Sequence, residues 1–520
     1  SPLITNKHVL IKVFGAAVQG IDATLITIEV NSSRGCMFYL VGLPDSAVKE
    51  SHQRIISALQ VNGYRIPTSN IIINMAPADI RKEGSAYDLP LAIGMLAAGE
   101  VIQPDKLNRY LMMGELSLDG SLQPIKGALP IAIKARELGF EGIIVPRQNA
   151  LEAAVVNQIQ VYGVENIKEV IEFFNGKQEL TPTIVNTREE FYAQQSSFDL
   201  DFADVKGQEN VKRALEVAAA GGHNIILIGA PGSGKSMLAK RLPSILPPLS
   251  LGESLETTKI HSVAGRLQNN TGLISKRPFR DPHHTISTVA MTGGGSYPQP
   301  GEISLAHNGI LFLDELPEFN RSVLEVLRQP LEDRKITISR VKSNVEYPAS
   351  FMLVASMNPC PCGYYNHPTK ACVCSPGQVQ KYLNRISGPL LDRIDLQIEV
   401  VPVPFEKMSD AHPGEASSSI RERVISARQI QENRYADIPG VYCNAQMSSK
   451  LLSLYARPDD KGLALLKNAM NRLNLSARAY DRILKVARTI ADLENSDLIQ
   501  PSHLAEAIGY RNLDREDWAG

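Results

Sequence analysis

The chain has 520 residues, of which 43% are hydrophobic and 21% are charged, and its formal net charge is −1. These values are typical of a globular protein with about two to four domains. A net charge near zero excludes binding of nucleic acid through bulk positive charge, so such binding requires a local basic surface. No run approaches the ~18 apolar residues of a membrane span, and the start lacks the apolar core of a signal peptide, so we expect a cytoplasmic protein without membrane contact.

Residues 1–178 alternate short apolar runs with helical patterns, which predicts an α/β or α+β domain. The runs at 23–30, 70–74 and 142–145 are predicted to be strands, and residues 88–98 are predicted to form a helix. Residues 179–201 are polar and without clear periodicity, which indicates a linker.

The most informative motif follows a buried-strand pattern at 224–228 and precedes a helical pattern at 237–242. It has the form G-x-x-x-x-G-K-[ST], and it consists of Gly229, Pro231, Gly232, Ser233, Gly234, Lys235 and Ser236 around Ala230. Loop N–H groups at a helix N-terminus form an anion site, Lys235 is expected to reach the β/γ-phosphate oxygens, and Ser236 is expected to ligate Mg²⁺. The motif predicts a nucleoside triphosphate site.

Two further strand patterns end in polar residues. The apolar run 309–313 ends in Asp314 and Glu315, and the run 351–357 ends in Asn358. Ligands of parallel sheets lie beyond the carboxyl ends of the strands. We therefore expect Asp314 to hold Mg²⁺ through water, Glu315 to deprotonate an attacking water and Asn358 to position that water, which predicts hydrolysis.

The long segment between the glycine loop and Asp314 is predicted to be a functional loop at 279–284 and 293–301. His283 and His284 are candidates there for donating hydrogen bonds to phosphates. Residues 333–347 alternate as two short strands around a turn with Arg340 and Lys342, the second candidate DNA contact. A solvated basic turn is the alternative interpretation.

Four cysteines lie together after Asn358. The pairs are Cys360 with Cys362 and Cys372 with Cys374, and four thiolates are the natural tetrahedral ligand set for Zn²⁺. Free thiols on a loop are the alternative, and His367, which lies between the pairs, is a possible substitute ligand. Beyond residue 403, helical spacing at 418–435, 463–470, 476–492 and 502–509 predicts a helical C-terminal domain.

These motifs resemble those of the magnesium-chelatase-like branch of the AAA+ ATPases. The resemblance also includes two later segments, Arg385-Ile-Ser-Gly-Pro-Leu-Leu-Asp-Arg393-Ile-Asp395 and Ser476-Ala-Arg478. The resemblance implies an AAA+ P-loop α/β domain at 202–403 with a four-cysteine insert at 360–374, and a helical lid at 404–520. It implies that Asn358 is the sensor-1 residue, that Arg393 is an arginine finger for a neighbouring subunit, and that Arg478 is a sensor-2 arginine on its own subunit's nucleotide. A site completed in trans implies a ring, which in this family is a hexamer.

Residues 1–178 resemble a Lon-protease-type (ChlI-like) domain. Ser85 aligns loosely with the serine of the Lon Ser–Lys pair, but Leu129 stands where the lysine is expected. A serine without a base is a poor nucleophile, so we expect a non-proteolytic module that binds nucleic acid or organises the ring. Lys126, nearby in sequence, leaves the proteolytic alternative open.

The resemblance as a whole implies a hexameric ATP- and Mg²⁺-dependent DNA motor of the helicase type. Its expected role is branch migration in homologous recombination of incoming DNA during natural transformation, with single-stranded or branched DNA and recombination proteins as partners. A chelatase-type ATPase for metal insertion and an AAA+ protein remodeller are the alternatives. The polymer or cofactor that stimulates ATP hydrolysis would distinguish the three.

Overall fold

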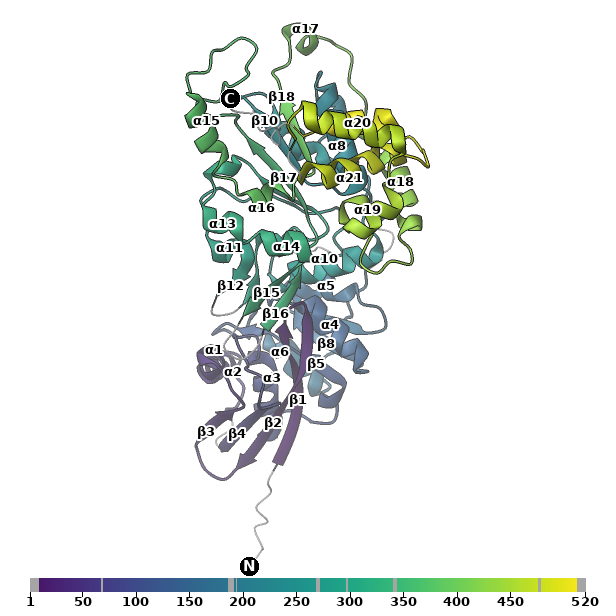
Figure 1. Ribbon diagram of the computed structural model, residues 1–520. Coiled ribbons are helices and arrows are strands. Elements are labelled where there is room, and N and C mark those ends of the chain that lie inside the picture. Colours follow the sequence, from purple (N-terminus) through teal and green to yellow (C-terminus); the bar gives the residue numbers. More distant parts are fainter. Residues whose placement is uncertain are drawn as a thin grey trace, which may run out of the picture.

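The computed structural model describes residues 9–66, 69–185, 191–192, 194–267, 272–295, 298–339, 344–475 and 478–511. Figure 1 shows an elongated molecule with the N-terminal domain at the bottom, the nucleotide-binding domain above it, and the C-terminal helices packed against one side of the upper part. No helix among these residues is long and apolar enough to cross a membrane.

The N-terminal domain is built on a seven-stranded mixed sheet of order β3-β4-β2-β1-β5-β8-β9. Helix α3 packs against β1 and β2, and every residue of α3 is buried, so this helix is apolar nearly all round rather than amphipathic. The strands are β1 (Val9–Gln19), β2 (Asp22–Ser33), β3 (Phe38–Val41), β4 (Asn70–Ala76), β5 (Tyr110–Met112), β8 (Gly142–Pro146) and β9 (Gln160–Val164), with a small ribbon of β6 (Glu115–Leu116) and β7 (Leu122–Gln123). The helices are α1 (Ser46–Lys49), α2 (Ser51–Val61), α3 (Asp88–Ala98), α4 (Ala128–Glu137), α5 (Ala150–Ala154) and α6 (Ile167–Phe174).

The nucleotide-binding domain contains a five-stranded parallel sheet of order β11-β14-β17-β10-β18. Four of these strands are nearly continuous buried runs because helices cover both faces. The strands are β10 (Ile225–Gly229), β11 (Phe279–Arg280), β14 (Ile310–Leu313), β17 (Met352–Met357) and β18 (Leu396–Val400). The helices are α8 (Glu209–Gly221), α9 (Lys235–Arg241), α10 (Leu251–Val263), α11 (Thr288–Thr292), α12 (Glu302–Leu305), α13 (Arg321–Glu325), α14 (Arg328–Asp333), α15 (Pro376–Leu383), α16 (Gly388–Leu391) and α17 (Phe405–Met408).

The C-terminal helices share a hydrophobic core with this sheet. They are α18 (Ser417–Arg434), α19 (Ser449–Tyr455), α20 (Asp460–Arg472), α21 (Arg478–Leu493) and α22 (Pro501–Ile508). A buried polar chain joins the two parts: His223 Nδ1 lies 2.8 Å from Asp395 Oδ2, and His223 Nε2 lies 2.6 Å from the Thr489 hydroxyl oxygen. The lid is therefore anchored at the start of β18.

The predicted strands at 23–30, 70–74, 142–145, 224–228, 309–313 and 351–357 correspond to β2, β4, β8, β10, β14 and β17 to within a few residues. The predicted helix at 88–98 is α3, and the helical patterns beyond residue 403 correspond to α18, α20, α21 and α22. The two short strands expected within 333–347 are the antiparallel pair β15 (Lys335–Ser339) and β16 (Asn344–Pro348). The prediction of loop alone at 279–284 and 293–301 is wrong in part. Phe279–Arg280 forms edge strand β11, and Gly293–Gly294 pairs with Gln299–Pro300 as the strands β12 and β13. Strands of two residues are too short to give a periodic pattern.

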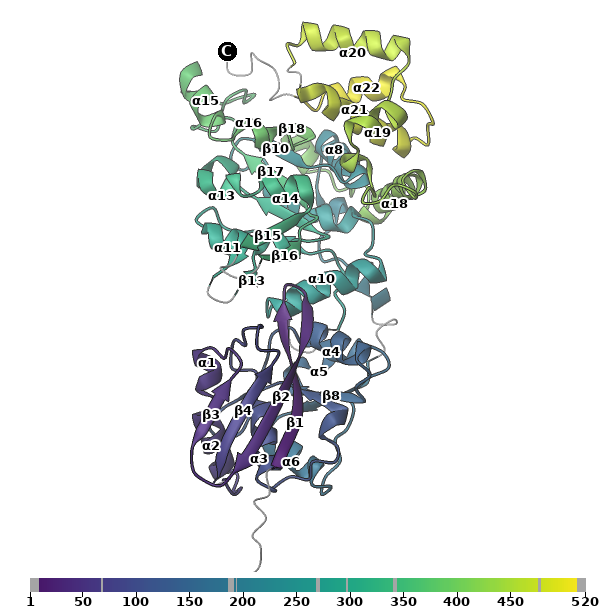
Figure 2. The same ribbon diagram turned by 60° about the horizontal axis from the view of Figure 1, so that its bottom comes forward.

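The two sheets are joined through α10, which packs against α4 of the N-terminal domain. Ser262 near the end of α10 makes the contact: its carbonyl oxygen accepts from Gly127 N at 2.8 Å, and its hydroxyl accepts from Leu129 N at 3.2 Å. The same hydroxyl donates to Glu152 Oε2 at 2.6 Å, where burial raises the pKa of the Glu152 carboxyl. Figure 2 shows the β1–β2 hairpin standing up from the N-terminal sheet towards α10.

Candidate nucleotide site and its surroundings

The glycine loop joins β10 to α9 and has the conformation that its sequence requires. Gly232 and Gly234 have φ values of 77° and 98°, in the left-handed region that favours glycine. A Cβ on Gly229 would lie 2.4 Å from the Val400 carbonyl oxygen, so this position also excludes a side chain. Ser233 is 5% exposed, and its hydroxyl oxygen has no hydrogen-bond partner among the described residues. A buried, unpaired hydroxyl in this loop fits a bound phosphate.

Lys235 lies at the centre of the loop. Its ammonium donates to the carbonyl oxygen of Gly229 and, at 3.0 Å, to Asn358 Oδ1. Burial lowers the pKa of Lys235 to about 8, against the opposing attraction of Asp314 and Glu315. The structure thus brings Lys235 together with Asn358, although 123 residues separate them in the chain.

The predicted Mg²⁺ ligands also meet. The Ser236 hydroxyl donates to Asp314 Oδ2 at 3.1 Å, and the Ser356 hydroxyl of the neighbouring strand donates to the other oxygen of the same carboxylate. Hydroxyl and carboxylate oxygens are ligands that Mg²⁺ prefers, so Ser236 and Asp314 fit the ion. Glu315 follows in a left-handed conformation, with φ 56°, and its side chain is exposed at the mouth of the site.

One carboxylate at this edge was not predicted. Asp281 directly follows β11, which pairs in parallel with β14, so it emerges on the same side of the sheet as Asp314 and two residues before it in register. Burial raises the pKa of Asp281, and the charge of Asp314 raises it further. The sequence signal for this position was weak because β11 has only two residues.

Arg393 lies at the opposite end of the sheet. It precedes β18, and its carbonyl oxygen accepts from the side chain of Asn224, the residue before β10. Since β10 and β18 run in parallel, Arg393 is separated from the glycine loop by the length of a strand, ~16 Å at ~3.3 Å per residue. Its guanidinium lies 3.2 Å from Glu332 on the surface. The backbone of Arg393 is therefore about one strand length from the glycine loop of its own subunit.

Arg478 begins α21, and its side chain is outside the described part of the structure. One turn later, the Arg482 guanidinium lies 3.2 Å from Asp395, next to Arg393. The start of α21 thus lies near the Arg393 end of the sheet. The prediction that Arg478 contacts its own subunit's nucleotide stays a prediction.

The four predicted metal ligands come together. The sulfurs of Cys360, Cys362, Cys372 and Cys374 all lie within 4.8 Å of one another, and among the first three the separations are 3.3, 3.7 and 3.6 Å. A tetrahedron with Zn–S bonds of about 2.3 Å has S···S edges of about 3.8 Å, so the set fits Zn²⁺. His367 instead accepts backbone N–H groups of Thr369 and Lys370 at 3.1 and 2.9 Å.

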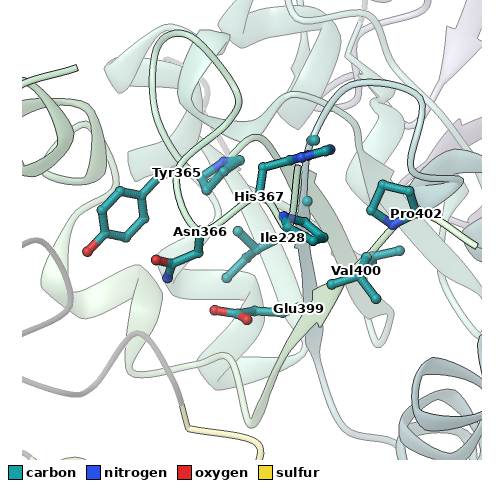
Figure 3. A pocket seen from close by; sticks show the side chains of 12 residues that line it. Ile228, Tyr365, Asn366, His367, Glu399, Val400 and Pro402 are labelled. Atoms are coloured by element: carbon teal, nitrogen blue, oxygen red, sulfur yellow. The ribbon is translucent and has the colours of Figure 1, made fainter. Parts of the chain in front are cut away.

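The cysteine loop packs directly against the nucleotide site. A Cβ on Gly363 would lie 2.7 Å from Pro231 of the glycine loop, so the two loops are in close contact. Figure 3 shows residues between the two cysteine pairs, Tyr365, Asn366 and His367, which line a pocket together with Glu399 and Val400 at the ends of β10 and β18. The shape of the nucleotide site therefore depends on the conformation of this loop.

The predicted DNA contacts fall into two places. The strands β15 and β16 form the expected hairpin, but Arg340 and Lys342 at its turn lie outside the described residues. His283 and His284 stack with ring centroids 4.2 Å apart. They lie near Phe319, just after Glu315, and not on the hairpin. His284 helps to line an open pocket with Glu318, Asn320 and Ser322.

In the N-terminal domain, Leu129 is fully buried at the start of α4. The side chain of Lys126 lies over Gly265 of the ATPase domain, where a Cβ would come within 3.0 Å of it. Ser85 and Lys126 both line a cavity between the two domains.

Comparisons with known proteins agree with this arrangement. The families described as "Subunit ChlI of Mg-chelatase", "Magnesium chelatase, subunit ChlI" and "Magnesium chelatase, subunit ChlI C-terminal" match residues 28–149, 201–408 and 414–511, respectively. The competence protein ComM of Haemophilus influenzae is 44% identical over 507 residues, which are 97% of each chain. YifB of Escherichia coli is 44% identical over 510 residues, 96% of each chain.

A shorter similarity is confined to one part of another protein. Lon protease 2 of Bacillus subtilis is 29% identical over 130 residues, which are 24% of this chain and 23% of that protein. This likeness fits the expected Lon-type fold.

Proposed function

We propose that this chain, which belongs to the magnesium-chelatase-like AAA+ family that includes the competence protein ComM, is a ring-forming ATPase that moves on DNA. Its expected task is branch migration during recombination of incoming DNA in natural transformation. The family supports an ATPase with a role in competence. The DNA-motor step rests on the β15–β16 hairpin, which is inserted between the strands that carry Asp314 and Asn358.

In the proposed reaction, the glycine loop and Lys235 hold the phosphates of ATP, while Ser236 and Asp314 hold Mg²⁺. Bound Mg²⁺ supplies charge neutralisation on the phosphate oxygens. Glu315 removes a proton from the attacking water, and Asn358, which already contacts Lys235 at 3.0 Å, keeps that water aligned with the γ-phosphate. The proposed set then lacks only an arginine that would stabilise the transferred phosphoryl group in the transition state.

Arg393 is the proposed source of that cation, acting on the neighbouring subunit. Its position at the end of the sheet opposite Lys235 supports action in trans, because a fixed fork of guanidinium donors must lie within hydrogen-bond distance of the phosphate. Arg478 is proposed to contact the nucleotide of its own subunit, as a sensor-2 arginine. A site that requires two subunits around a closed circle supports a ring, and the family suggests a hexamer.

The hairpin β15–β16 carries the proposal that the ring acts on DNA. Its base packs into the ATPase core through Ile336 and Tyr347, so movement of the core is transmitted to the turn. Arg340 and Lys342 at that turn would place positive charge on the ring axis even though the chain is neutral overall. His283 and His284 lie apart from the hairpin and are the weaker candidates for DNA contact.

The cysteine cluster is proposed to hold one structural Zn²⁺ through all four thiolates. Zinc would fix the loop that covers Pro231, and would thereby hold the glycine loop and Asn358 in place. The fit of the sulfur separations to a tetrahedral site supports this assignment over free thiols.

The test of the proposed function is to compare stimulators of ATP hydrolysis by the assembled protein. Single-stranded and forked DNA are expected to raise the rate, and ATP is expected to drive strand separation of a forked or three-stranded substrate. Stimulation by a porphyrin with Mg²⁺ would favour the chelatase alternative instead. Stimulation by an unfolded protein alone would favour the remodelling alternative.

A further inference from the structure

Asp395 is a buried carboxylate to which the proposed reaction gives no role. It lies two residues after Arg393, just before β18, and is 3% exposed. Its Oδ2 atom lies 2.8 Å from His223 Nδ1, and its Oδ1 atom lies 3.2 Å from the Arg482 guanidinium on the lid helix α21. Burial would raise the pKa of the Asp395 carboxyl, but the hydrogen bond from His223 and the charge of Arg482 lower it below its ordinary value. The ionised carboxylate thus ties the lid to the chain directly after Arg393.

The cations of the lid helix also act on the side chain of Arg393. Burial lowers the pKa of Lys485, about one turn after Arg482 on α21, and the charge of Arg393 is among those that lower it further. Repulsion between these like charges favours a conformation in which Arg393 extends towards the surface. Its guanidinium does lie 3.2 Å from Glu332, which is exposed. Arg393 is therefore placed where a phosphate of a neighbouring subunit can compete with Glu332 for it.

The backbone around Arg393 is fixed from two directions. On the side of the sheet, the Arg393 carbonyl oxygen accepts from the Asn224 side chain at 2.8 Å, and Asp395 N donates to the Asn224 carbonyl oxygen at 3.0 Å. On the side of the lid, the carbonyl oxygens of Ile394 and Asp395 accept from the guanidinium of Arg511, which follows α22, at 2.6 and 2.8 Å. The lid therefore contacts both residues that follow Arg393, through their backbone and through the Asp395 side chain.

We propose that Arg482 of the lid, acting through Asp395, positions Arg393 for the nucleotide site of the neighbouring subunit. This inference rests on the proposed function, in which Arg393 supplies a cation in trans. Arg482 acts on Arg393 and not on a nucleotide, so it is a positioning residue. A displacement of a reacting group by ~1 Å can lower a rate ~10²-fold. The lid of one subunit thereby controls hydrolysis at the next site.

The variant Arg482→Gln removes the lid cation that contacts Asp395. We expect its turnover number for ATP to fall about 10- to 10²-fold, with KM and ring assembly unchanged, because the glycine loop is not altered. Arg482→Lys keeps a cation at this position and should restore most of the rate. Arg472→Gln, which changes an exposed arginine at the end of α20 in the same lid, is the matched control. A normal turnover number for Arg482→Gln, a loss that appears only in KM, or an equal loss for Arg472→Gln would overturn the proposal.

Two combinations distinguish positioning from a general weakening of the lid. Adding Arg482→Gln to Arg393→Ala should lower turnover no further, because Arg482 acts only through Arg393. Mixing Arg482→Gln subunits with Lys235→Ala subunits should restore part of the activity, because the Lys235→Ala subunits still supply a correctly placed Arg393. A further loss in the double variant would overturn the proposal. So would the absence of rescue under conditions in which Arg393→Ala subunits are rescued by Lys235→Ala subunits.

Hydrogen exchange tests the positioning without ATP. In full-length Arg482→Gln, the amides of residues 393–396 should exchange faster than in the unchanged protein, and in Arg472→Gln they should not. Unchanged exchange at these amides, together with slow hydrolysis by Arg393→Ala, would overturn this inference alone. Normal hydrolysis by Arg393→Ala would instead overturn the proposed role of Arg393, and with it the catalytic part of this inference, whatever the exchange shows.

Discussion

The two sheets of this protein use their edges differently. In the ATPase sheet, parallel strands stay paired to their carboxyl ends, and the residues that follow β10, β14 and β17 converge: Lys235 contacts Asn358, and Ser236 contacts Asp314. In the N-terminal sheet, β1 and β5 separate after one pair of residues and leave a cavity. The first arrangement gathers the candidate catalytic side chains at one edge of the sheet, whereas the second leaves a cavity where the two domains meet.

The largest expected effect tests whether the upper site needs a second subunit. Arg393→Ala should lower ATP turnover about 10³-fold, because an arginine finger stabilises charge that develops only in the transition state, while ATP binding stays intact. Mixing Arg393→Ala subunits with Lys235→Ala subunits should restore part of the activity. Arg385→Ala, which removes a nearby exposed arginine, is the matched control. No rescue in rings shown to contain both variants would argue that Arg393 acts within its own subunit.

The next effect tests the division of roles at the strand ends. Glu315→Gln should lower turnover by ~10² or more while leaving ATP binding and assembly unchanged, because the amide cannot accept the proton of the attacking water. The rate is measured by phosphate release, and binding by a fluorescent ATP analogue. Glu318→Gln, one turn further along and also exposed, should behave as the unchanged protein. Normal hydrolysis by Glu315→Gln would refute its assignment as the base.

Glu315 was identified from a local sequence pattern, whereas Arg393 was identified only through the family resemblance. The glycine loop, Asp314 with Glu315, and Asn358 each follow an apolar run, so a local pattern predicts both the strand and its functional end. The position of Asp281 at this edge was not predicted, because the strand before it has only two residues. The cavity beside β1 was not predicted. It depends on where two strands separate and on where two domains meet, and neither is encoded in a local sequence pattern.

The cysteine cluster was predictable in part. Its spacing predicted four ligands, and the structure brings the four sulfurs within 4.8 Å of one another. Its contact with the glycine loop, through Gly363 and Pro231, was not predictable, because it depends on how the loop after β17 folds back over β10.

Changing the hairpin turn tests whether the upper sheet acts on DNA. Arg340→Ala with Lys342→Ala should weaken DNA binding about tenfold across sequences, and should lower the slope of log K against log salt by ~0.7 for each single-strand phosphate that the turn no longer neutralises. Basal hydrolysis should survive, whereas its stimulation by DNA should fall. Lys335→Ala, at the base of the same hairpin and paired with Glu346, controls for removal of charge away from the turn. A double variant that binds and unwinds DNA normally would return the chelatase and remodelling alternatives to first place.

Metal removal tests the link between the cysteine loop and the nucleotide. Metal analysis of the protein should give about one Zn per subunit, and Cys362→Ser should lower this content and weaken ATP binding severalfold through the loosened contact with Pro231. Cys443→Ser changes a buried cysteine of the lid and should leave the metal content unchanged. Protein purified without chelators that carries no metal and four titratable thiols would refute the zinc site.

The smallest expected effect is the pH dependence of ATP affinity, which tests how strongly Lys235 is shielded from water. Burial lowers the pKa of Lys235 to about 8 in the free protein, so its ammonium is charged at pH 7 and largely neutral at pH 9. Phosphate binding requires the charged form, so ATP affinity should fall as pH rises through 8, by up to about tenfold between pH 7 and 9. The phosphates of ATP do not titrate in this range, and they favour the protonated lysine, so saturating ATP should move the midpoint upward. The Lys235→Arg variant keeps its charge throughout this range, so its ATP affinity should not change with pH. If the affinity of the unchanged protein were also independent of pH, Lys235 would be better solvated than its contacts with Gly229 and Asn358 indicate.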